Sequence, residues 1–311
     1  FWIRPSVRFL NSYLRENHVD AVITTGPPHS MHLIGLGLKK RRNIFWVADF
    51  RDPWTGIDFY HRLKLSKWAD QKHHRLENMV LRHADQVVAV GQLMAEELRF
   101  LGARSCVTIP NGYDPEDFSE VQKIEPEKRF SILHLGAINK DRNHEVFYRV
   151  LSQLIEDSPD FRKGLHLKFI GKNDHAVQEA IEKWGLSDNT EFVSYIPHSD
   201  IQEALSCSQI LYLPLNNTPN AKSILTGKIF EYLASGKPIL GIGPEDGEAA
   251  RIIQETGSGH MVGFDNDLAL REIITGWFDQ YRQGILKSDQ HGVEKYSRRA
   301  LTSELAAIMK R

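Results

Sequence analysis

Short runs of apolar, β-branched and aromatic residues alternate with segments of helical periodicity along almost the whole chain. In the first half, four such runs are predicted to be buried strands: residues 20–26, 43–50, 86–91 and 106–112. Helical patterns lie at residues 1–17 and 63–83, before and between these strands. Strands that alternate with helices in this order predict an α/β fold with a parallel sheet and helices on both of its faces.

The same alternation starts again in the second half, after a polar segment. Residues 114–129 are rich in Asp, Glu, Lys and Pro, which predicts a solvated linker between two domains. Five further strands are predicted after it, at residues 129–136, 166–171, 191–196, 209–215 and 238–243. The last segment, residues 293–310, has the apolar periodicity of a helix.

The composition narrows the possible classes of protein. The chain has 311 residues, a length typical of about two domains. A formal net charge of -1 argues against bulk electrostatic capture of nucleic acid. The two cysteines, Cys106 and Cys207, imply no disulfide framework and fit a reducing compartment. No apolar run reaches the length of a membrane span.

The first half has fewer predicted strands than a complete Rossmann-like sheet, which usually has about six. The chain also opens at Phe1, inside a helical pattern. We therefore expect the first domain to be incomplete in this chain and to lack its first strand.

Ligands of open parallel sheets bind beyond the carboxyl ends of the strands, next to helix N-termini. This rule points to the loop after residues 129–136. Gly136 would let the backbone approach a phosphate, and Lys140 and Arg142 could neutralise that phosphate. An ordinary solvated basic loop would contain the same residues, so both interpretations stay open.

A second loop of this kind follows residues 209–215. Thr226 is predicted to be the N-cap of the next helix, and Gly227 to open it. Lys228 and Glu231 lie three residues apart and so share one face of that helix. A cation and a carboxylate at a helix start could bind a nucleoside diphosphate and its ribose, or they could form an ordinary intrahelical salt bridge.

Polar residues also follow two strands of the first half. His29 lies on a proline-supported turn after the first strand, and the next strand ends with Asp49, Arg51 and Asp52, followed by Trp54. A single histidine is often structural, but its place at the carboxyl end of a strand makes His29 a candidate site residue.

Residues 59–75 combine cationic and aromatic side chains, so they could contact an anionic membrane or a lipid phosphate, or form a solvated helix face. His73 and His74 lie in this stretch and are interpreted as surface residues. The sequence has no CxxC, HExxH or GxSxG motif. We also recognise no Asp-x-Asp metal motif, and we therefore expect no requirement for a metal or a cofactor.

Four stretches resemble family 4 glycosyltransferases, whose GT-B fold consists of two facing Rossmann-like domains. They are residues 84–118, 133–143, 194–215 and 227–243. The sequences GPPHS and DFRDPW, at residues 26–30 and 49–54, resemble a branch that builds bacterial surface polysaccharides. The resemblance implies an N-terminal domain at residues 1–122, a nucleotide-sugar domain at 123–292 and a helix at 293–311 that crosses back to the first domain.

The resemblance also implies roles for individual residues. Glu231 would hold the ribose hydroxyls of the donor, while Lys228 and Arg142 would bind its diphosphate. The backbone of Tyr195, Ile196 and Pro197 would recognise the base.

Further roles concern the loops around the donor and the acceptor. Gly136, Lys140, Thr226 and Gly227 would border the donor. His29 would lie near the reacting carbon, with Asp49, Arg51 and Asp52 on the acceptor side. One departure from the family is Ser223, which stands where a second Glu commonly contacts the donor sugar.

The implied activity is transfer of a sugar from a nucleoside diphosphate sugar, with UDP-sugars favoured, to a glycan or lipid-linked acceptor with retention of configuration. We expect a cytoplasmic protein that can contact the inner face of the membrane through the basic helix near residues 60–75, and no nucleic-acid partner. Two alternatives stay open: a GT-B sugar-nucleotide epimerase, and a non-catalytic subunit that binds sugar nucleotides.

Overall fold

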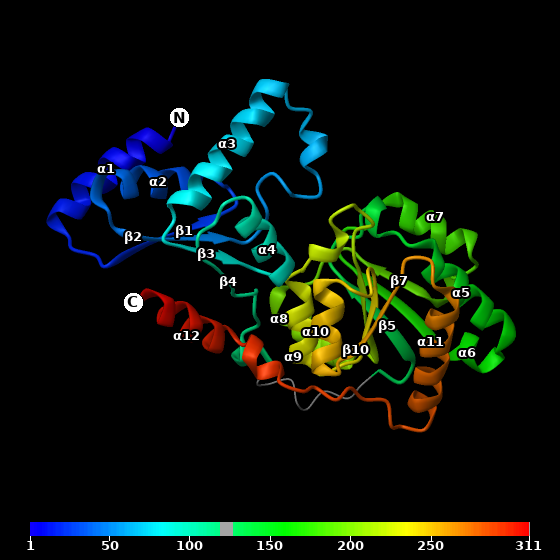
Figure 1. The fold of residues 1–311 in the computed structure, drawn as a ribbon. Coiled ribbons are helices and arrows are strands. Elements are labelled where there is room, and N and C mark those ends of the chain that lie inside the picture. The colour runs from blue at the N-terminus through cyan, green and yellow to red at the C-terminus, as the bar shows by residue number, and fades with distance from the viewer. Residues whose placement is uncertain (119–126, 311) are drawn as a thin grey trace. The chain divides into compact units, whose positions relative to one another are not determined.

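The computed structural model describes residues 1–118 and 127–310, which form two compact units. Unit 1 consists of Phe1–Asn111 and Ala300–Arg311, and unit 2 consists of Gly112–Arg299. Each unit has its own parallel sheet (Figure 1), so the expected α/β class with two Rossmann-like sheets is confirmed.

The polar segment expected to link the domains lies only partly within the described residues, because 119–126 are outside them. In the described part of the chain, no helix has both the length and the apolar character needed to cross a membrane.

Unit 1 contains a four-stranded parallel sheet whose strands lie side by side in sequence order. The strands are β1 (Ala21–Gly26), β2 (Phe45–Phe50), β3 (Gln86–Ala89) and β4 (Cys106–Thr108). Gly26 of β1 is paired with Phe50 of β2, so both strands end at the same edge of the sheet. The residues that follow β1 and β2 therefore meet at this carboxyl edge.

Five α-helices belong wholly or mostly to unit 1: α1 (Ile3–Glu16), α2 (Ser30–Arg42), α3 (Lys67–His83), α4 (Gln92–Phe100) and α12 (Arg298–Met309). One face of the sheet packs against α2, α3 and α4 through a core that includes Trp46 and Val80. The other face packs against α12 through Leu301, which contacts Val47 and Val88. Helix α1 packs on the outer side of α2 through Val7.

Unit 2 contains a six-stranded parallel sheet in the order β10-β9-β8-β5-β6-β7. The strands are β5 (Phe130–Leu135), β6 (Leu165–Ile170), β7 (Thr190–Val193), β8 (Ile210–Pro214), β9 (Ile239–Ile242) and β10 (Gly259–Val262). The chain runs outward from β5 in one direction through β6 and β7, then returns to β8 and runs in the other. The order therefore reverses between β5 and β8, which is where doubly wound sheets bind ligands.

Seven helices cover the two faces of this sheet: α5 (Glu145–Asp157), α6 (Pro159–Gly164), α7 (His175–Lys183), α8 (His198–Cys207), α9 (Lys228–Ser235), α10 (Glu248–Thr256) and α11 (Asp267–Arg282). Alternate strand residues separate the two cores. Ile132 packs with α5, α6, α7 and α11, whereas its neighbour Leu133 packs with α8, α9 and α10.

Besides β4, which ends at Thr108 and not at residue 112, four elements differ from the prediction. Strand β10 was not predicted, because its sequence, GHMV, contains a glycine and a histidine and so gives no continuous apolar run. Strand β7 ends at Val193 instead of residue 196, and Tyr195 beyond it is 78% exposed. Helix α3 begins at Lys67 because Ser66 caps it by accepting a hydrogen bond from the Ala69 amide.

The fourth difference concerns the C-terminal helix, which begins at Arg298 and not at Val293. Val293–Tyr296 is a short 3-10 helix, η7, whose first and last side chains are buried in the core of unit 2. Ser297 is extended, and Leu301 then packs in the core of unit 1. The apolar pattern that predicted one helix over residues 293–310 thus combines residues that pack in the core of unit 2 with residues that pack in the core of unit 1.

Candidate active site

The carboxyl ends of β5 and β6 in unit 2 come close together because each is followed by a glycine. Gly136 has φ +98 and Gly171 has φ +127, values that favour glycine. The Gly136 amide donates a hydrogen bond to the Ile170 carbonyl at 2.6 Å. A Cβ on Gly136 would lie 2.5 Å from the Lys228 Nζ atom. The glycine therefore leaves the space that the Lys228 ammonium occupies.

Lys228 is the first residue of α9 and is partly buried. Burial, reinforced by the charge of Arg142 and opposed by that of Glu231, lowers the pKa of Lys228 to about 8. Within residues 1–118 and 127–310, the Lys228 ammonium makes no hydrogen bond and no ion pair, although the opposite charge of Glu231 acts on it through space. An ammonium at a helix N-terminus that is not bonded to a carboxylate is suited to bind an anion.

Arg142 lies on the 3-10 turn η4 (Lys140–Arg142), which follows β5. Its Nε donates to the Asn216 Oδ1 at 2.7 Å, and Asn216 is buried just beyond the end of β8. Asn216 thus fixes the Arg142 guanidinium across the point where the strand order reverses. Lys140 lies on the same turn and is exposed. We call Gly136, Arg142, Lys228 and Glu231 the cationic cluster.

Helix α9 is attached to the sheet by Tyr232, a residue that the sequence interpretation did not single out. The buried Tyr232 hydroxyl accepts a hydrogen bond from the Leu135 amide at 3.0 Å. The same hydroxyl donates to the Tyr212 carbonyl at 3.4 Å. These bonds tie the middle of α9 to both β5 and β8, so they help to hold Lys228 and Glu231 in place.

His134 lies in β5 and is completely buried. Burial, with the charge of Lys228 acting in the same direction, lowers the pKa of His134 to about 3. The ring is therefore neutral at pH 7, and its Nδ1 lies 3.0 Å from the Tyr212 carbonyl, which requires an Nδ1–H donor. Neither His134 nor Asn216 gave a signal in the sequence, because their partners are more than seventy residues away.

The start of α9 differs from the sequence prediction. Gly227, and not Thr226, occupies the N-cap position, and no side chain caps the helix. The buried Oγ1 of Thr226 has no hydrogen-bond partner in the described residues. Ser223, in the 3-10 turn before α9, donates its Oγ to the Asn220 carbonyl at 2.9 Å. The Ser223 hydroxyl is thus bonded within its own turn.

The turn expected to recognise the base lies between β7 and α8. Tyr195 is exposed, Ile196 packs partly against the core of unit 2, and Pro197 is the N-cap of α8. Within the described residues, no backbone hydrogen bond involves Tyr195 or Ile196. Their amide and carbonyl groups are thus available to a ligand.

The chain has one Asp-x-Asp spacing, at Asp265 and Asp267, so the interpretation that it contains no such motif was wrong. Both oxygens of the Asp267 carboxylate accept hydrogen bonds from Arg149, at 2.7 and 2.8 Å. This fork lowers the pKa of Asp267, with the hydrogen bond to Arg149 as the main cause. Asp267 thus serves as an ion-pair partner at the start of α11.

In unit 1, His29 stands at the N-cap of α2, at the carboxyl edge of the sheet. Its ring stacks on Trp54 with the centroids 5.2 Å apart, and it lies 5.8 Å from the ring of His32. Burial lowers the pKa of His29 to about 4 and that of His32 to about 3. Both rings are therefore neutral at pH 7. We call His29, His32, Phe50 and Trp54 the histidine cluster.

The histidine cluster is held by buried hydrogen bonds of His32 and is flanked by a third histidine, His73. His32, spaced three residues after His29, lies 2.9 Å from the Thr24 hydroxyl, which accepts from the Trp46 indole nitrogen. His73, expected at the surface, is partly buried and packs edge-on against Trp54 at 6.2 Å. The spacing of His29 and His32 was a signal that the sequence interpretation missed.

Asp49 and Arg51 lie beside this cluster and form an ion pair, with Nε and Oδ1 3.0 Å apart. Thr25 donates its hydroxyl to the other oxygen of Asp49 at 2.9 Å. Arg51 also donates to the Ile109 carbonyl at 2.6 Å. The pair thus joins the carboxyl ends of β1 and β2 to the segment after β4. Asp52 is exposed.

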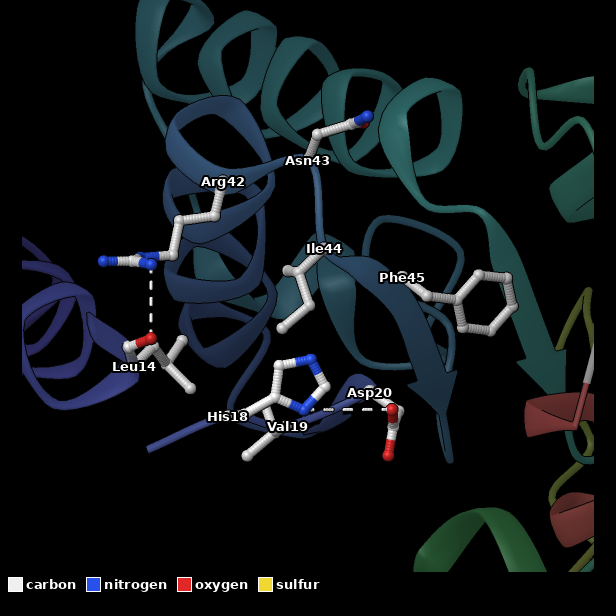
Figure 2. Close-up of a pocket in the computed structure, with 8 residues that line it drawn as sticks. All are labelled: Leu14, His18, Val19, Asp20, Arg42, Asn43, Ile44 and Phe45. Carbon is white, nitrogen blue, oxygen red and sulfur yellow. Dashed lines mark hydrogen bonds and ion pairs between the residues drawn. The ribbon is translucent and has the colours of Figure 1, made fainter. Parts of the chain in front are cut away.

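A hollow of about 350 Å³ in unit 1 lies at the opposite edge of the sheet (Figure 2). Its lining includes the loops before β1 and β2, with His18, Asp20 and Ile44. Arg42 at its border donates to the Leu14 carbonyl at 3.2 Å, which ties α2 to α1. Because this hollow is at the amino ends of the strands, it is separate from the histidine cluster.

Two sequence families match the two halves of the chain. Glycosyltransferase Family 4 matches residues 2–117, and Glycosyl transferases group 1 matches residues 129–278. The chain is thus a glycosyltransferase. It is an enzyme of the GT-B fold, and transfer of a sugar from a nucleotide sugar is its class of reaction.

Solved structures agree with this fold. Sucrose-phosphate synthase (tll1590) from Thermosynechococcus elongatus has a TM-score of 0.71 and 15% identity, covering 98% of this chain and 76% of its own. Anabaena Alr3699/HepE in complex with UDP has a TM-score of 0.73 and 14% identity, and the match covers 98% of this chain and 82% of the HepE chain. The lipopolysaccharide outer core galactosyltransferase WaaB has a TM-score of 0.63 and 15% identity, and the match covers 99% of this chain and 80% of the WaaB chain.

No curated protein matches the chain. At these identities the solved structures establish the fold of the glycosyltransferase and not its substrates. The roles of the cationic cluster and of the histidine cluster follow from their own chemistry, as argued below.

Proposed function

We propose that this glycosyltransferase moves a sugar from a UDP-sugar to a glycan or lipid-linked acceptor, with retention of configuration, in the synthesis of a bacterial cell-surface polysaccharide. The observation that supports the donor half of the proposal is the Lys228 ammonium, which is partly buried, lies over Gly136 and makes no hydrogen bond or ion pair within the described residues. A diphosphate would supply the ion-pair partner.

The leaving group in such a transfer is a nucleoside diphosphate, whose negative charge grows as the glycosidic bond breaks. Lys228 and Arg142 would neutralise this charge, together with the positive end of the α9 dipole. The two cations repel each other in the free protein, so an anion between them would relieve that repulsion. We propose that they act without a divalent metal ion or other cofactor.

The positions of Glu231, Tyr195 and Ile196 suggest the contacts to the ribose and the base of the donor. Glu231 lies one turn beyond Lys228 on α9, at a suitable distance along the helix for the ribose hydroxyls. The unbonded backbone groups of Tyr195 and Ile196 could read the edge of the base. UDP is favoured as the donor nucleotide because a protein of similar fold, Alr3699/HepE, was solved with UDP.

The acceptor half of the proposal rests on the histidine cluster. His29 is held neutral at the carboxyl edge of unit 1, so it could donate or accept a hydrogen bond with a sugar hydroxyl at pH 7. Asp49 and Arg51 would keep its loops in position, and Asp52 remains a candidate contact to the acceptor. We propose that the reaction takes place in the cytoplasm, where nucleotide sugars are made.

The test is a product assay with the intact chain, radiolabelled UDP-, GDP- and ADP-sugars, and a panel of glycan and lipid-linked acceptors. The proposal predicts a new glycoside that forms at the same rate as UDP release, survives chelation of metals, and keeps the donor's anomeric configuration by NMR. A requirement for magnesium or manganese would contradict the metal-independent mechanism.

The same assay separates the alternatives. A sugar-nucleotide epimerase would convert the donor without making a glycoside. A non-catalytic subunit would bind the donor without turnover, and Ser223 keeps this alternative open because its hydroxyl is bonded to Asn220.

A further inference from the structure

Glu77 is a buried carboxylate of unit 1 that belongs neither to the cationic cluster nor to the histidine cluster. It lies on α3 and is 2% exposed. Burial raises the pKa of its carboxyl group, because removal from water disfavours the charged form. A buried carboxylate is costly unless hydrogen-bond donors surround it, so the partners of Glu77 indicate what it does.

The hydrogen-bond donors to Glu77 come from the loop that follows β2. The Thr55 hydroxyl donates to Oε2 at 2.5 Å, and the Thr55 amide donates to Oε1 at 3.3 Å. The backbone of Trp54 also forms a hydrogen bond with this carboxylate. Two successive backbone amides and a hydroxyl thus surround one carboxylate, an arrangement that fixes the backbone of the loop.

The same loop holds the His29 ring. The Pro53 backbone forms a hydrogen bond with this ring, and the Trp54 ring stacks on it with the centroids 5.2 Å apart. His29 is thus held by the two residues that directly precede Thr55. One short segment, residues 53–55, therefore connects Glu77 on α3 with His29 at the start of α2.

Helix α3 contacts this segment at a second point. His73 lies four residues before Glu77 on α3, so the two side chains share one face of the helix. The His73 ring packs edge-on against the Trp54 ring, with the centroids 6.2 Å apart. The side chain of Trp54 is therefore supported by His73, and its backbone is held by Glu77.

We propose that Glu77 is a positioning residue of the histidine cluster, because its carboxylate holds residues 53–55 in the conformation that keeps the His29 ring in place. Glu77 acts through this segment and not on a substrate. The consequence for sugar transfer rests on the proposed function of His29, whereas the consequence for the His29 ring does not. The two consequences can therefore be measured separately.

The experiment measures the pKa of His29 by NMR titration of its ring protons in the intact chain, assigned with His29→Gln. Glu77→Met removes the carboxylate but keeps a flexible side chain of similar size. Loss of the negative charge alone would lower the pKa of His29 further. Loosening of residues 53–55 would instead admit water to the ring, so we expect this pKa to rise from about 4 towards 6.5.

Three further variants separate positioning from general loss of stability. Thr55→Val removes the hydroxyl donor from the other partner, so it should also raise the pKa of His29. Glu77→Gln keeps one acceptor oxygen and should have a smaller effect than Glu77→Met. Leu38→Ala is the control, because Leu38 is buried in the separate core between α1 and α2. It should lower stability and leave the titration of His29 unchanged.

An unmoved or lowered pKa of His29 in Glu77→Met would overturn the proposal. If that variant does not fold, the same result in Thr55→Val would overturn it. An equal rise in Leu38→Ala would also overturn it, since the rise would then reflect destabilisation of unit 1 as a whole.

Glycoside formation by the same variants tests the consequence for the reaction. Glu77→Met should lower turnover about 100-fold, the usual cost of displacing a positioned group by about 1 Å, with UDP affinity unchanged. A raised pKa of His29 with full turnover would support the positioning role of Glu77 and contradict the proposed role of His29 in transfer.

Discussion

Both units gather polar residues at the carboxyl edge of a parallel sheet, but they treat charge in opposite ways. In unit 1, Asp49 and Arg51 neutralise each other, and burial keeps His29 uncharged. In unit 2, Lys228 and Arg142 are both cationic, lie close enough to repel, and have a neutral His134 beneath them. The site of unit 1 thus carries no excess charge, whereas unit 2 holds a positive potential that an anion would satisfy.

This difference shows how two similar sheets can have different roles in one transfer reaction. A preformed positive site binds the nucleoside diphosphate and stabilises it as it leaves, since charges fixed before the reaction need no reorganisation during it. A neutral site of histidine and aromatic side chains suits uncharged sugar hydroxyls. The predictions that follow test whether charge is divided between the units in this way.

The largest effect is expected from Lys228→Ala, which removes the ammonium over Gly136. Turnover should fall about 100- to 1000-fold, the usual cost of losing one electrostatic contact to a developing negative charge. Lys163→Ala is the matched control, because Lys163 is an exposed lysine of unit 2 outside the cluster. Full turnover by the Lys228 variant would remove the cationic cluster from the mechanism.

Gly136→Ala should come next, since its Cβ would lie 2.5 Å from the Lys228 Nζ and displace it. We expect UDP affinity to fall roughly 100-fold, near the upper end of the effect of losing a charged hydrogen bond. Gly185→Ala is the control, because Gly185 also has a positive φ, +64, but open space around it. Calorimetry should show both variants less stable and only the Gly136 variant deficient in binding.

Glu231→Ala should weaken UDP binding by about 1.5–3 kcal/mol, or roughly 10- to 150-fold, through lost hydrogen bonds to the ribose. The melting temperature should be unchanged. Pyrophosphate, which has no ribose, serves as the control ligand, and its affinity should not fall. If UDP and pyrophosphate weaken equally, Glu231 acts only through its charge on Lys228.

Arg51→Ala should have the smallest effect on donor binding, because Arg51 belongs to unit 1. Losing its bonds to Asp49 and to the Ile109 carbonyl should destabilise the protein by about 1–3 kcal/mol. UDP affinity should be unchanged. Thermal unfolding and calorimetry on the same preparation check both statements, and a loss of UDP affinity with normal stability would contradict the separation of the units.

The sequence predicted the sheets well because each strand is a local apolar run. It also found Gly136, Arg142, Lys228 and Glu231, since these residues lie at strand and helix ends where the topology places ligands. Whether these four residues bind a donor stays a prediction.

The sequence could not predict the residues that hold the cluster in place. Arg142 and Asn216 are 74 residues apart, and Leu135 and Tyr232 are 97 apart. Such pairs depend on how strands are ordered in the sheet, which no local pattern records. The prediction that Thr226 is the N-cap was wrong for a local reason, because the helix starts from Gly227 without any side-chain cap.

The most direct test of the donor site is the pKa of Lys228, measured by NMR of its side-chain methylene carbon in the free protein and with UDP bound. The account predicts a pKa of about 8 in the free protein, lowered by burial and by Arg142. A bound diphosphate favours the charged ammonium, so UDP should raise this pKa towards 10.5. UDP affinity should accordingly fall about tenfold between pH 7 and pH 9. UDP binding that leaves the titration of Lys228 unmoved would contradict the account.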